Sequence, residues 1–319
     1  MSDVPVIDAL VPDELPRGEL CRRWVEISSA ALGSPVLVPV LAARGRQDGP
    51  VLGVTAALHG NELNGIPVIQ RLFRELDPAA LKGTLVGVPV LNVPSFLAQE
   101  RIFPDDADLN RVMPGRPDGG ESDVYTHRLL EKLLTRVRFL VDLHTASFGR
   151  VNSHYVRADM QSEVIAELAR AQNAEIIVNS TGERGTLRLL LGQQGIACVT
   201  VELGDPYIYQ PAMIDRGLTG VRNTLRHLGM LKGKVTKPPR PAVECSRAYW
   251  LYTDRGGLLE VLPDVGTRVE PGEIVARLTN VFGDEVHRYA APEAGIVVGK
   301  SSNPVNHTGG RILHLGIST

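Results

Sequence analysis

The amino-acid sequence predicts an α/β protein with a smaller β-rich region near its C-terminal end. Two observations carry this prediction. Short apolar runs alternate with helix-like patterns up to residue 232, and glycine-punctuated β-like runs fill residues 244–319. Alternating strands and helices are typical of a sheet flanked by helices. The expected strands of the first region are residues 36–42, 51–58, 85–91, 139–143, 175–178 and 196–203.

The last helix of the first region is predicted from a single apolar stripe. Its members recur at alternating steps of four and three residues, which places them on one face, and the helix should end near Gly229. They are Ile214, Leu218, Val221, Leu225 and Leu228. The next residues are polar and proline-rich, as in an extended connector. We therefore expect a first domain over residues 1–232, a connector over residues 233–243 and a β-rich domain over residues 244–319.

The β-rich region contains a weak internal repeat, because residues 257–275 can be laid over residues 295–313 with their glycines aligned. Two similar halves of short β runs predict a small sandwich built from two hairpin units. This pattern resembles the barrel-sandwich fold of biotinyl and lipoyl carrier domains, which present a modified lysine between the halves. Residues 278–286 stand at that place and contain no lysine. A carrier role is therefore not expected, and a lid, a selectivity element and an oligomer interface stay open.

The composition is that of an ordinary soluble globular protein. The chain has 319 residues, 43% of them hydrophobic and 22% charged, and a net charge of −2, so no basic surplus favours nucleic acid. Cys21, Cys198 and Cys245 lack metal-type spacing, which predicts reduced thiols. Residues 1–8 lack a signal-peptide pattern, and no apolar run is long enough to span a bilayer. We expect a cytoplasmic protein with no membrane partner, and the sequence leaves a homo-oligomer open.

His59 and Glu62 stand three residues apart, directly after the apolar run of residues 51–58, in the sequence His-Gly-Asn-Glu. An imidazole and a carboxylate at this place are two candidate metal ligands. A catalytic zinc ion usually takes three protein ligands and leaves a fourth position for water or substrate. Taken singly, a histidine after a strand is more often a surface or capping residue. The pair therefore needs a third ligand from another part of the chain.

Two further polar residues stand at the ends of apolar runs. His144 follows residues 139–143, and Glu202 lies near the end of the run of residues 196–203, before Gly204. In open α/β sheets, ligands bind beyond the carboxyl ends of the strands, so these side chains can converge with His59 and Glu62. We expect His144 to be the third ligand and Glu202 to face the metal-bound water. Packed or solvated roles are expected for the other histidines, His127, His154, His227, His287, His307 and His314.

A long polar loop over residues 99–115 lies between the segment that carries His59 and Glu62 and the segment that carries His144. Compact domains seldom carry such a loop without a functional reason. Arg111 offers a planar fork suited to a carboxylate, Asn110 could add a neutral donor, and Arg101 could polarise a carbonyl or stabilise an oxyanion. Without the candidate metal ligands, solvated surface arginines would be the preferred interpretation.

Four motifs in this order resemble the succinylglutamate desuccinylase/aspartoacylase family of the zinc carboxypeptidase-like superfamily. They are His-Gly-Asn-Glu, Asp-Leu-Asn-Arg-Val-Met-Pro-Gly, Asp-Leu-His-Thr and Val-Glu-Leu-Gly. The resemblance extends from about Ser34 to the C-terminal end of the sequence. It implies a zinc-carboxypeptidase-like mixed sheet flanked by helices, and it makes residues 1–232 the catalytic domain of a zinc hydrolase.

The resemblance also implies roles for single residues. His59, Glu62 and His144 would bind one zinc ion per chain, and Glu202 would be the general base and acid.

Asn110 and Arg111 would hold a substrate carboxylate, and Arg101 would share the oxyanion charge with zinc. Tyr207 and Tyr209 are candidates for the family's substrate-binding tyrosine by proximity to Glu202 only.

These features predict zinc-dependent hydrolysis of the amide bond of a small N-acyl amino acid. A carboxypeptidase that acts on short peptides could use the same zinc ion and carboxylate clamp. A non-enzymatic protein that binds acyl amino acids would not need Glu202 opposite the metal. Two histidines and a carboxylate also form the iron site of non-haem oxygenases. Glu202 and the Asn110 and Arg111 pair favour hydrolysis over the iron alternative.

Overall fold

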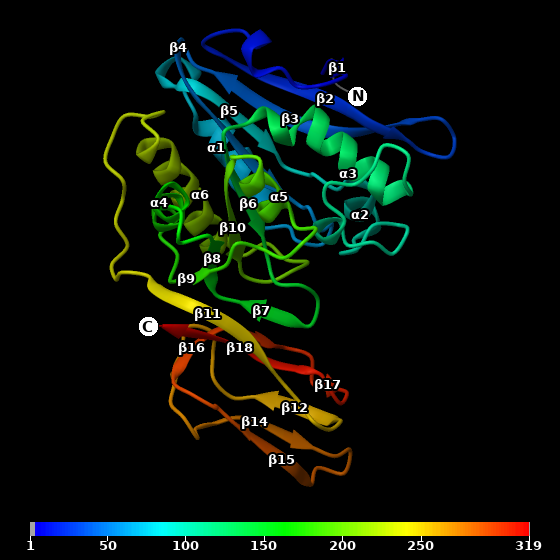
Figure 1. The fold of residues 1–319 in the computed structure, drawn as a ribbon, viewed down its shortest axis with the longest axis vertical. Coiled ribbons are helices and arrows are strands. Elements are labelled where there is room, and N and C mark those ends of the chain that lie inside the picture. Colours follow the sequence, from blue (N-terminus) through cyan, green and yellow to red (C-terminus); the bar gives the residue numbers. More distant parts are fainter. Residues whose placement is uncertain (1–3, 319) are drawn as a thin grey trace.

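A long mixed sheet runs through most of the molecule in the computed structural model, which describes residues 4–318 (Figure 1). Its strands, in order across the sheet, are β1 (Val6–Ile7), β2 (Glu19–Ser29), β3 (Pro35–Arg44), β5 (Lys82–Val88), β4 (Gln47–Ala56), β6 (Phe139–His144), β10 (Ala197–Leu203), β8 (His154–Ala158), β9 (Ile176–Asn179), β11 (Val243–Tyr252), β18 (Arg311–Ser318), β16 (Gly295–Ser301) and β13 (Arg268–Val269), with β7 (Arg150–Asn152) beside β16.

Helices cover both faces of the first part of this sheet. The α-helices are α1 (Gly65–Glu75), α2 (Val93–Ala98), α3 (Glu121–Lys132), α4 (Glu163–Ala171), α5 (Leu187–Gln193) and α6 (Pro211–His227). The 3-10 turns are η1 (Pro12–Glu14), η2 (Pro78–Ala80), η3 (Leu109–Arg111) and η4 (Leu134–Arg136). Buried residues of α1, α4 and α6 share one core cluster, and those of α3 and α5 belong to a second. The predicted mixed sheet flanked by helices is therefore confirmed.

The six strands expected from apolar runs all occur, as β3, β4, β5, β6, β9 and β10. Strand β4 lies between β5 and β6 and is parallel to both, while β10 continues the parallel order beside β6. The next strand in the sequence, β5, lies on one side of β4, and the strand after that, β6, lies on its other side. The order of the strands across the sheet therefore reverses at β4. In α/β sheets a crevice for ligands forms beside such a strand, at its carboxyl end.

The apolar stripe predicted for the last helix is confirmed in α6. Ile214, Leu218, Val221 and Leu225 are buried against the sheet, and Leu228 follows the last helical residue. Gly229 has a φ of 68°, the left-handed conformation that commonly ends a helix.

The C-terminal region continues the long sheet, because β11 pairs in parallel with β9 and antiparallel with β18. A second sheet packs below it, as Figure 1 shows. Its strands are β15 (Glu285–Ala290), β14 (Ile274–Thr279), β12 (Gly257–Val261) and β17 (Val305–Asn306). Apolar residues from both sheets form one cluster, so the region is a sandwich.

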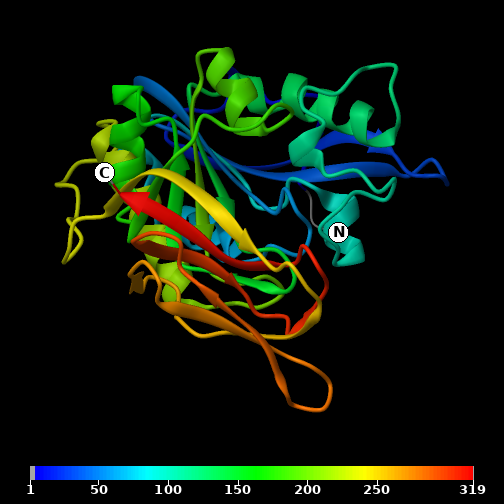
Figure 2. The ribbon, with the colours of Figure 1, turned by 60° about the horizontal axis from the view of Figure 1, so that its bottom comes forward.

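The internal repeat corresponds to two interlocked halves. Each half consists of a long strand, a short strand and another long strand, namely β12, β13 and β14 in the first and β16, β17 and β18 in the second. The short strands are exchanged: β13 pairs with β16, and β17 pairs with β12. The two sheets of the sandwich are therefore linked through both halves of the repeat (Figure 2).

Two sequence expectations concern the chain as a whole. Cys21, Cys198 and Cys245 are buried free thiols. Within the described part of the chain, no helix is both long and apolar enough to cross a membrane. Residues 1–3 of the N-terminal segment lie outside the described residues.

The packing of α6 gives a stability prediction. Leu218 is 3% exposed in the core cluster, whereas Leu97 of α2 is 74% exposed. We expect Leu218→Ala to lower the free energy of unfolding by about 2–5 kcal/mol, because it leaves a cavity between α6 and the sheet. Leu97→Ala is the matched control and should change it by less than about 0.5 kcal/mol. Urea denaturation measures both, and equal effects would contradict this packing.

Candidate metal centre and substrate pocket

The residues predicted for the site lie at the carboxyl ends of three neighbouring parallel strands, β4, β6 and β10. Glu202 is the register partner of His144, and Ala56, the last residue of β4, lies opposite Leu143. His59 and Glu62 follow in the loop between β4 and α1. Strand pairing therefore brings side chains that are far apart in the sequence to one edge of the sheet.

The loop that carries His59 and Glu62 is shaped by its backbone. Ala57 has a φ of 51°, which turns the chain sharply as it leaves β4. Gly60 approaches the backbone of α2 so closely that a Cβ atom there would lie 2.1 Å from the carbonyl carbon of Ser95. Any larger residue would displace this loop. The close approach of α2 therefore explains why glycine stands at this position of the His-Gly-Asn-Glu motif.

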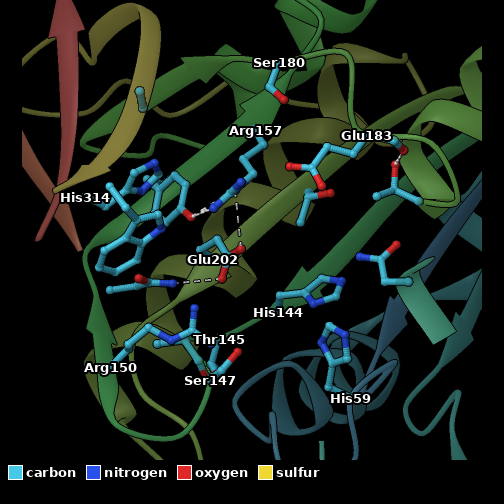
Figure 3. A pocket seen from close by; sticks show the side chains of 18 of the residues that line it. His59, His144, Thr145, Ser147, Arg150, Arg157, Ser180, Glu183, Glu202 and His314 are labelled. Atoms are coloured by element: carbon cyan, nitrogen blue, oxygen red, sulfur yellow. Dashed lines mark hydrogen bonds and ion pairs between the residues drawn. The ribbon is translucent and has the colours of Figure 1, made fainter. Parts of the chain in front are cut away.

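His59, Glu62 and His144 form a buried cluster whose candidate ligand atoms all lie within 4.8 Å of one another. Both imidazoles present Nδ1 to the carboxylate between them. His59 Nδ1 is 2.9 Å from Glu62 Oε1, and His144 Nδ1 is 2.9 Å from Glu62 Oε2. The structure therefore brings the three predicted ligands together (Figure 3 labels the two histidines).

The other ring nitrogen of each histidine faces a second carboxylate. His144 Nε2 lies 2.7 Å from Asp142 Oδ2, and His59 Nε2 lies 3.0 Å from Asp108 Oδ1. Thr55 Oγ1 donates to the other oxygen of Asp142. Such partners commonly fix the orientation of metal-binding histidines and leave the inner nitrogen free to coordinate. The cluster therefore fits a metal ion that takes imidazole nitrogen and carboxylate oxygen, and it is a candidate metal site.

Asp108 and Asp142 are functional candidates that the sequence analysis did not single out. A signal existed for Asp142, because it precedes His144 by two residues on one strand, and such residues share a face of the sheet. A carboxylate within an otherwise apolar strand also needs a partner. Asp108 carried a weaker signal, as the first residue of the Asp-Leu-Asn-Arg motif in a loop.

Opposite charges govern protonation in the cluster. Burial opposes ionisation of Glu62, but His59 and His144 outweigh it and lower its pKa well below the usual value. Burial likewise favours neutral His144, while the charges of Asp142 and Glu62 raise its pKa well above the usual value. Glu62 also accepts a hydrogen bond from the backbone N–H of Thr145. Its carboxylate is therefore held in the ionised form that a metal ligand needs.

Glu202 is buried beside this cluster, on β10. Burial raises its pKa, against the opposing charge of Arg157. Asn152 Nδ2 donates to Glu202 Oε2 at 3.1 Å, and Arg157 Nε lies 3.8 Å from Oε1. Figure 3 shows Glu202 near Arg157 and His144. A carboxyl group with a raised pKa, oriented by a neutral donor, is suited to take up and release a proton.

Arg101 lies against the metal cluster. Its Nη1 is 2.7 Å from Glu62 Oε1 and 2.6 Å from Ser147 Oγ, and its Nη2 is 3.0 Å from Asp108 Oδ2. These contacts tie the loop of residues 99–115 to the candidate ligands.

Asn110 and Arg111 line the same pocket as the cluster. Asn110 Oδ1 accepts the backbone N–H of Leu187 at the start of α5, which leaves its amide donor to other partners. Arg111 Nη2 is 3.5 Å from the exposed carboxylate of Glu183.

The pocket has a volume of about 330 Å³ and is lined by His59, Glu62, His144, Glu202, Arg101, Asn110 and Arg111 together with residues that the sequence analysis did not single out. Tyr207 and Tyr209 do not line it, and Tyr207 borders a neighbouring hollow instead. The tyrosines that do line it are Tyr155, Tyr249 and Tyr252.

The fold and the buried cluster together define an α/β protein with a candidate metal site at the carboxyl ends of its strands. Residues 48–228 match the family model of the succinylglutamate desuccinylase/aspartoacylase catalytic domain. The chain therefore belongs to this family.

Known proteins of similar sequence and structure support this membership of the family. The N-alpha-acetyl-L-2,4-diaminobutyric acid deacetylase of Halomonas elongata is 26% identical over 280 residues, which span 83% of this chain and 81% of that protein. The succinylglutamate desuccinylase of Pseudomonas paraeruginosa is 31% identical over 174 residues, about half of each chain. The crystal structure of a succinylglutamate desuccinylase from Silicibacter sp. TM1040 covers all of both chains with a TM-score of 0.85 and 25% identity.

The contacts of His144 give a prediction for the metal-free protein. Asp142→Asn removes a negative charge 2.7 Å from Nε2, so we expect His144 to titrate at a lower pH than in the parent protein. Nuclear magnetic resonance of the imidazole nitrogens measures this directly. Asp215→Asn, which neutralises a surface carboxylate paired with Arg71, is the control and should not move the titration. An unchanged titration in Asp142→Asn would refute the assigned contact.

Proposed function

We propose that this protein is a zinc-dependent deacylase that hydrolyses the amide bond of an N-acyl amino acid. The observation that carries the proposal is the buried Glu202 beside His59, Glu62 and His144 in one pocket. Membership of the family and relatives named as a deacetylase and a desuccinylase support the same reaction.

The three ligands would hold the metal with two imidazole nitrogens and one carboxylate, a set typical of catalytic zinc. A bound zinc ion would polarise the amide carbonyl and lower the pKa of water to about 7. Asp108 and Asp142 would keep the two histidines in the orientation that presents Nδ1 to the metal.

Glu202 would act as the general base and then as the general acid. It would take a proton from the attacking water and pass this proton to the amine that leaves when the carbon–nitrogen bond breaks. Asn152 holds Oε2, whereas Oε1 lies 3.8 Å from Arg157 Nε, beyond hydrogen-bond distance, and is the oxygen to which we assign proton transfer. A positioned acid or base of this kind contributes about 10²- to 10⁴-fold to the rate.

Arg111 and Asn110 would bind the carboxylate of the amino acid. The Arg111 partner, Glu183, is exposed, and ion pairs between exposed groups are weak, so a substrate carboxylate can replace it. Arg101 would stabilise the negative charge that develops on the carbonyl oxygen, since its guanidinium group lies beside Glu62. Together these contacts would fix the substrate across the scissile bond.

A substrate panel tests the reaction. We expect purified protein to release amino acids from N-acetyl or N-succinyl derivatives, to lose this activity on treatment with a chelator and to regain it with zinc. Cleavage of short peptides alone would favour a carboxypeptidase. Stoichiometric iron in protein purified without added metal, with oxygen-dependent turnover, would contradict a zinc hydrolase. Binding of acyl amino acids without turnover would indicate a binding protein.

The role of Glu202 is tested by Glu202→Gln. We expect the metal content to be unchanged and kcat to fall by at least about 10²-fold, because the amide cannot accept the proton. Glu244→Gln is the control, since Glu244 is an exposed partner of Arg170 outside the pocket, and its kcat should match the parent. A Glu202→Gln protein with parental turnover would show that another group is the base.

A further inference from the structure

One wall of the pocket comes from the C-terminal sandwich. Trp250 of β11 together with Arg311 and His314 of β18 line the same pocket as His59 and Glu202. Strand pairing makes this possible, because Trp250 and His314 are register partners. The C-terminal region therefore supplies side chains that a substrate in this pocket would meet.

Two guanidinium groups gather on a fixed aromatic surface in this wall. The Cζ atoms of Arg150 and Arg311 lie 5.9 and 5.6 Å from the centre of the Trp250 indole. The indole is itself stacked on His314, with ring centres 5.2 Å apart and planes at 9°. Stacked aromatic groups of this kind hold planar cations in place. Arg150 comes from β7 and Arg311 from β18, so two distant segments converge here.

Arg150 and Arg311 differ from other arginines of the pocket in their ion-pair partners. Within residues 4–318, neither side chain forms an ion pair, whereas Arg101, Arg111 and Arg157 of the same pocket each do. Burial and then the positive charges of Arg311 and Arg101 lower the pKa of Arg150, against the smaller opposing effect of Glu202 and Glu62. The two neighbouring cations repel each other, and an anion bound directly to both would relieve this repulsion. A carboxylate suits the planar forks of two arginines.

The position of these arginines indicates which part of a substrate they would meet. Figure 3 shows Arg150 on one side of Glu202 and Glu183, the partner of Arg111, on the other. If Arg111 holds the carboxylate of the amino acid, the scissile bond lies beside Glu202. The acyl group then extends towards Arg150 and Trp250.

We propose that Arg150 and Arg311, supported by Trp250, bind the free carboxylate of a dicarboxylic acyl group on the substrate. This inference rests on the proposed deacylase function and deepens it. The preferred substrates are then amino acids whose amide nitrogen carries the monoacyl group of a short dicarboxylic acid. Discrimination against an acetyl group comes from the two arginines, which an acetyl group leaves without an anion.

The test compares N-succinylalanine with N-acetylalanine, which differ only in the acyl group. We expect kcat/KM of the parent protein to be higher for N-succinylalanine. In Arg311→Met and Arg150→Met it should fall about 10- to 100-fold for N-succinylalanine, the usual effect of losing a charge-assisted hydrogen bond. The value for N-acetylalanine should change by less than about threefold, since an acetyl group makes no such bond.

Arg247→Met is the matched control. Arg247 also lies over an aromatic ring of β11, that of Tyr249, but it pairs with Glu293 and does not line the pocket. Its substitution should leave both kcat/KM values unchanged, and thermal unfolding should confirm that all three variants are folded. Equal losses for both substrates in Arg311→Met and Arg150→Met would overturn the proposal.

N-acetylglutamate separates the two ends of the substrate. If Arg311→Met and Arg150→Met depress its kcat/KM as much as that of N-succinylalanine, the arginines meet the amino-acid side chain, and the acyl assignment is wrong. If no acyl amino acid is hydrolysed, the proposed function fails, and calorimetry with succinate and acetate decides the subsite independently. Succinate binding that is lost in Arg311→Met supports it, and no difference from acetate refutes it.

Discussion

The parallel pairing of β6 with β4 on one side and β10 on the other is the constraint on which the whole site depends. Because parallel strands end at the same edge, the pairing of Glu202 with His144 and of Ala56 with Leu143 fixes how far apart their side chains can be. A register shift by one residue would turn His144 and Glu202 to the opposite face of the sheet. Buried apolar residues on both faces of β6 and β10 oppose such a shift.

The cost of burying charge explains why so many polar groups surround the cluster. Glu62 is buried, and an isolated carboxylate there would lose several kcal/mol of hydration free energy. Two imidazoles, the guanidinium group of Arg101 and the N–H of Thr145 compensate for this loss. Since each histidine is held in turn by an aspartate, no ligand can reorient alone. This network gives the cluster a defined shape before any ligand arrives.

Local sequence signals were sufficient to predict the strands that carry the site and the polar residues at which these strands end. Apolar runs with turn residues at their ends predicted β4, β6 and β10, and abrupt polar residues at those ends predicted His59, His144 and Glu202. Asp142 and Asp108 were not predicted because spacing along the chain alone does not show which side chain a carboxylate faces. Whether an aspartate near a histidine is its partner depends on side-chain direction as well as spacing.

Long-range pairing could not be predicted in the same way. The run that forms β11 has strand character in the sequence, but its residues say nothing about its partners β9 and β18. The same limit applies to Arg150 and Arg311, which meet only because β7 pairs with β16 and β16 with β18. Pairing partners depend on which surfaces remain to be covered once the whole chain has collapsed.

The exchange of short strands within the C-terminal sandwich fixes the position of the strands that form the pocket wall. Since β13 pairs with β16 and β17 with β12, neither half of the repeat can move without disturbing the other. Strand β18, which carries Arg311 and His314, lies between β11 and β16 and is therefore held on both sides. Strand β7, which carries Arg150, is hydrogen-bonded to β16 in the same sheet. The two arginines thus belong to one hydrogen-bonded framework that is continuous with β9, and the position of the wall relative to Glu202 follows from backbone pairing instead of from a flexible loop.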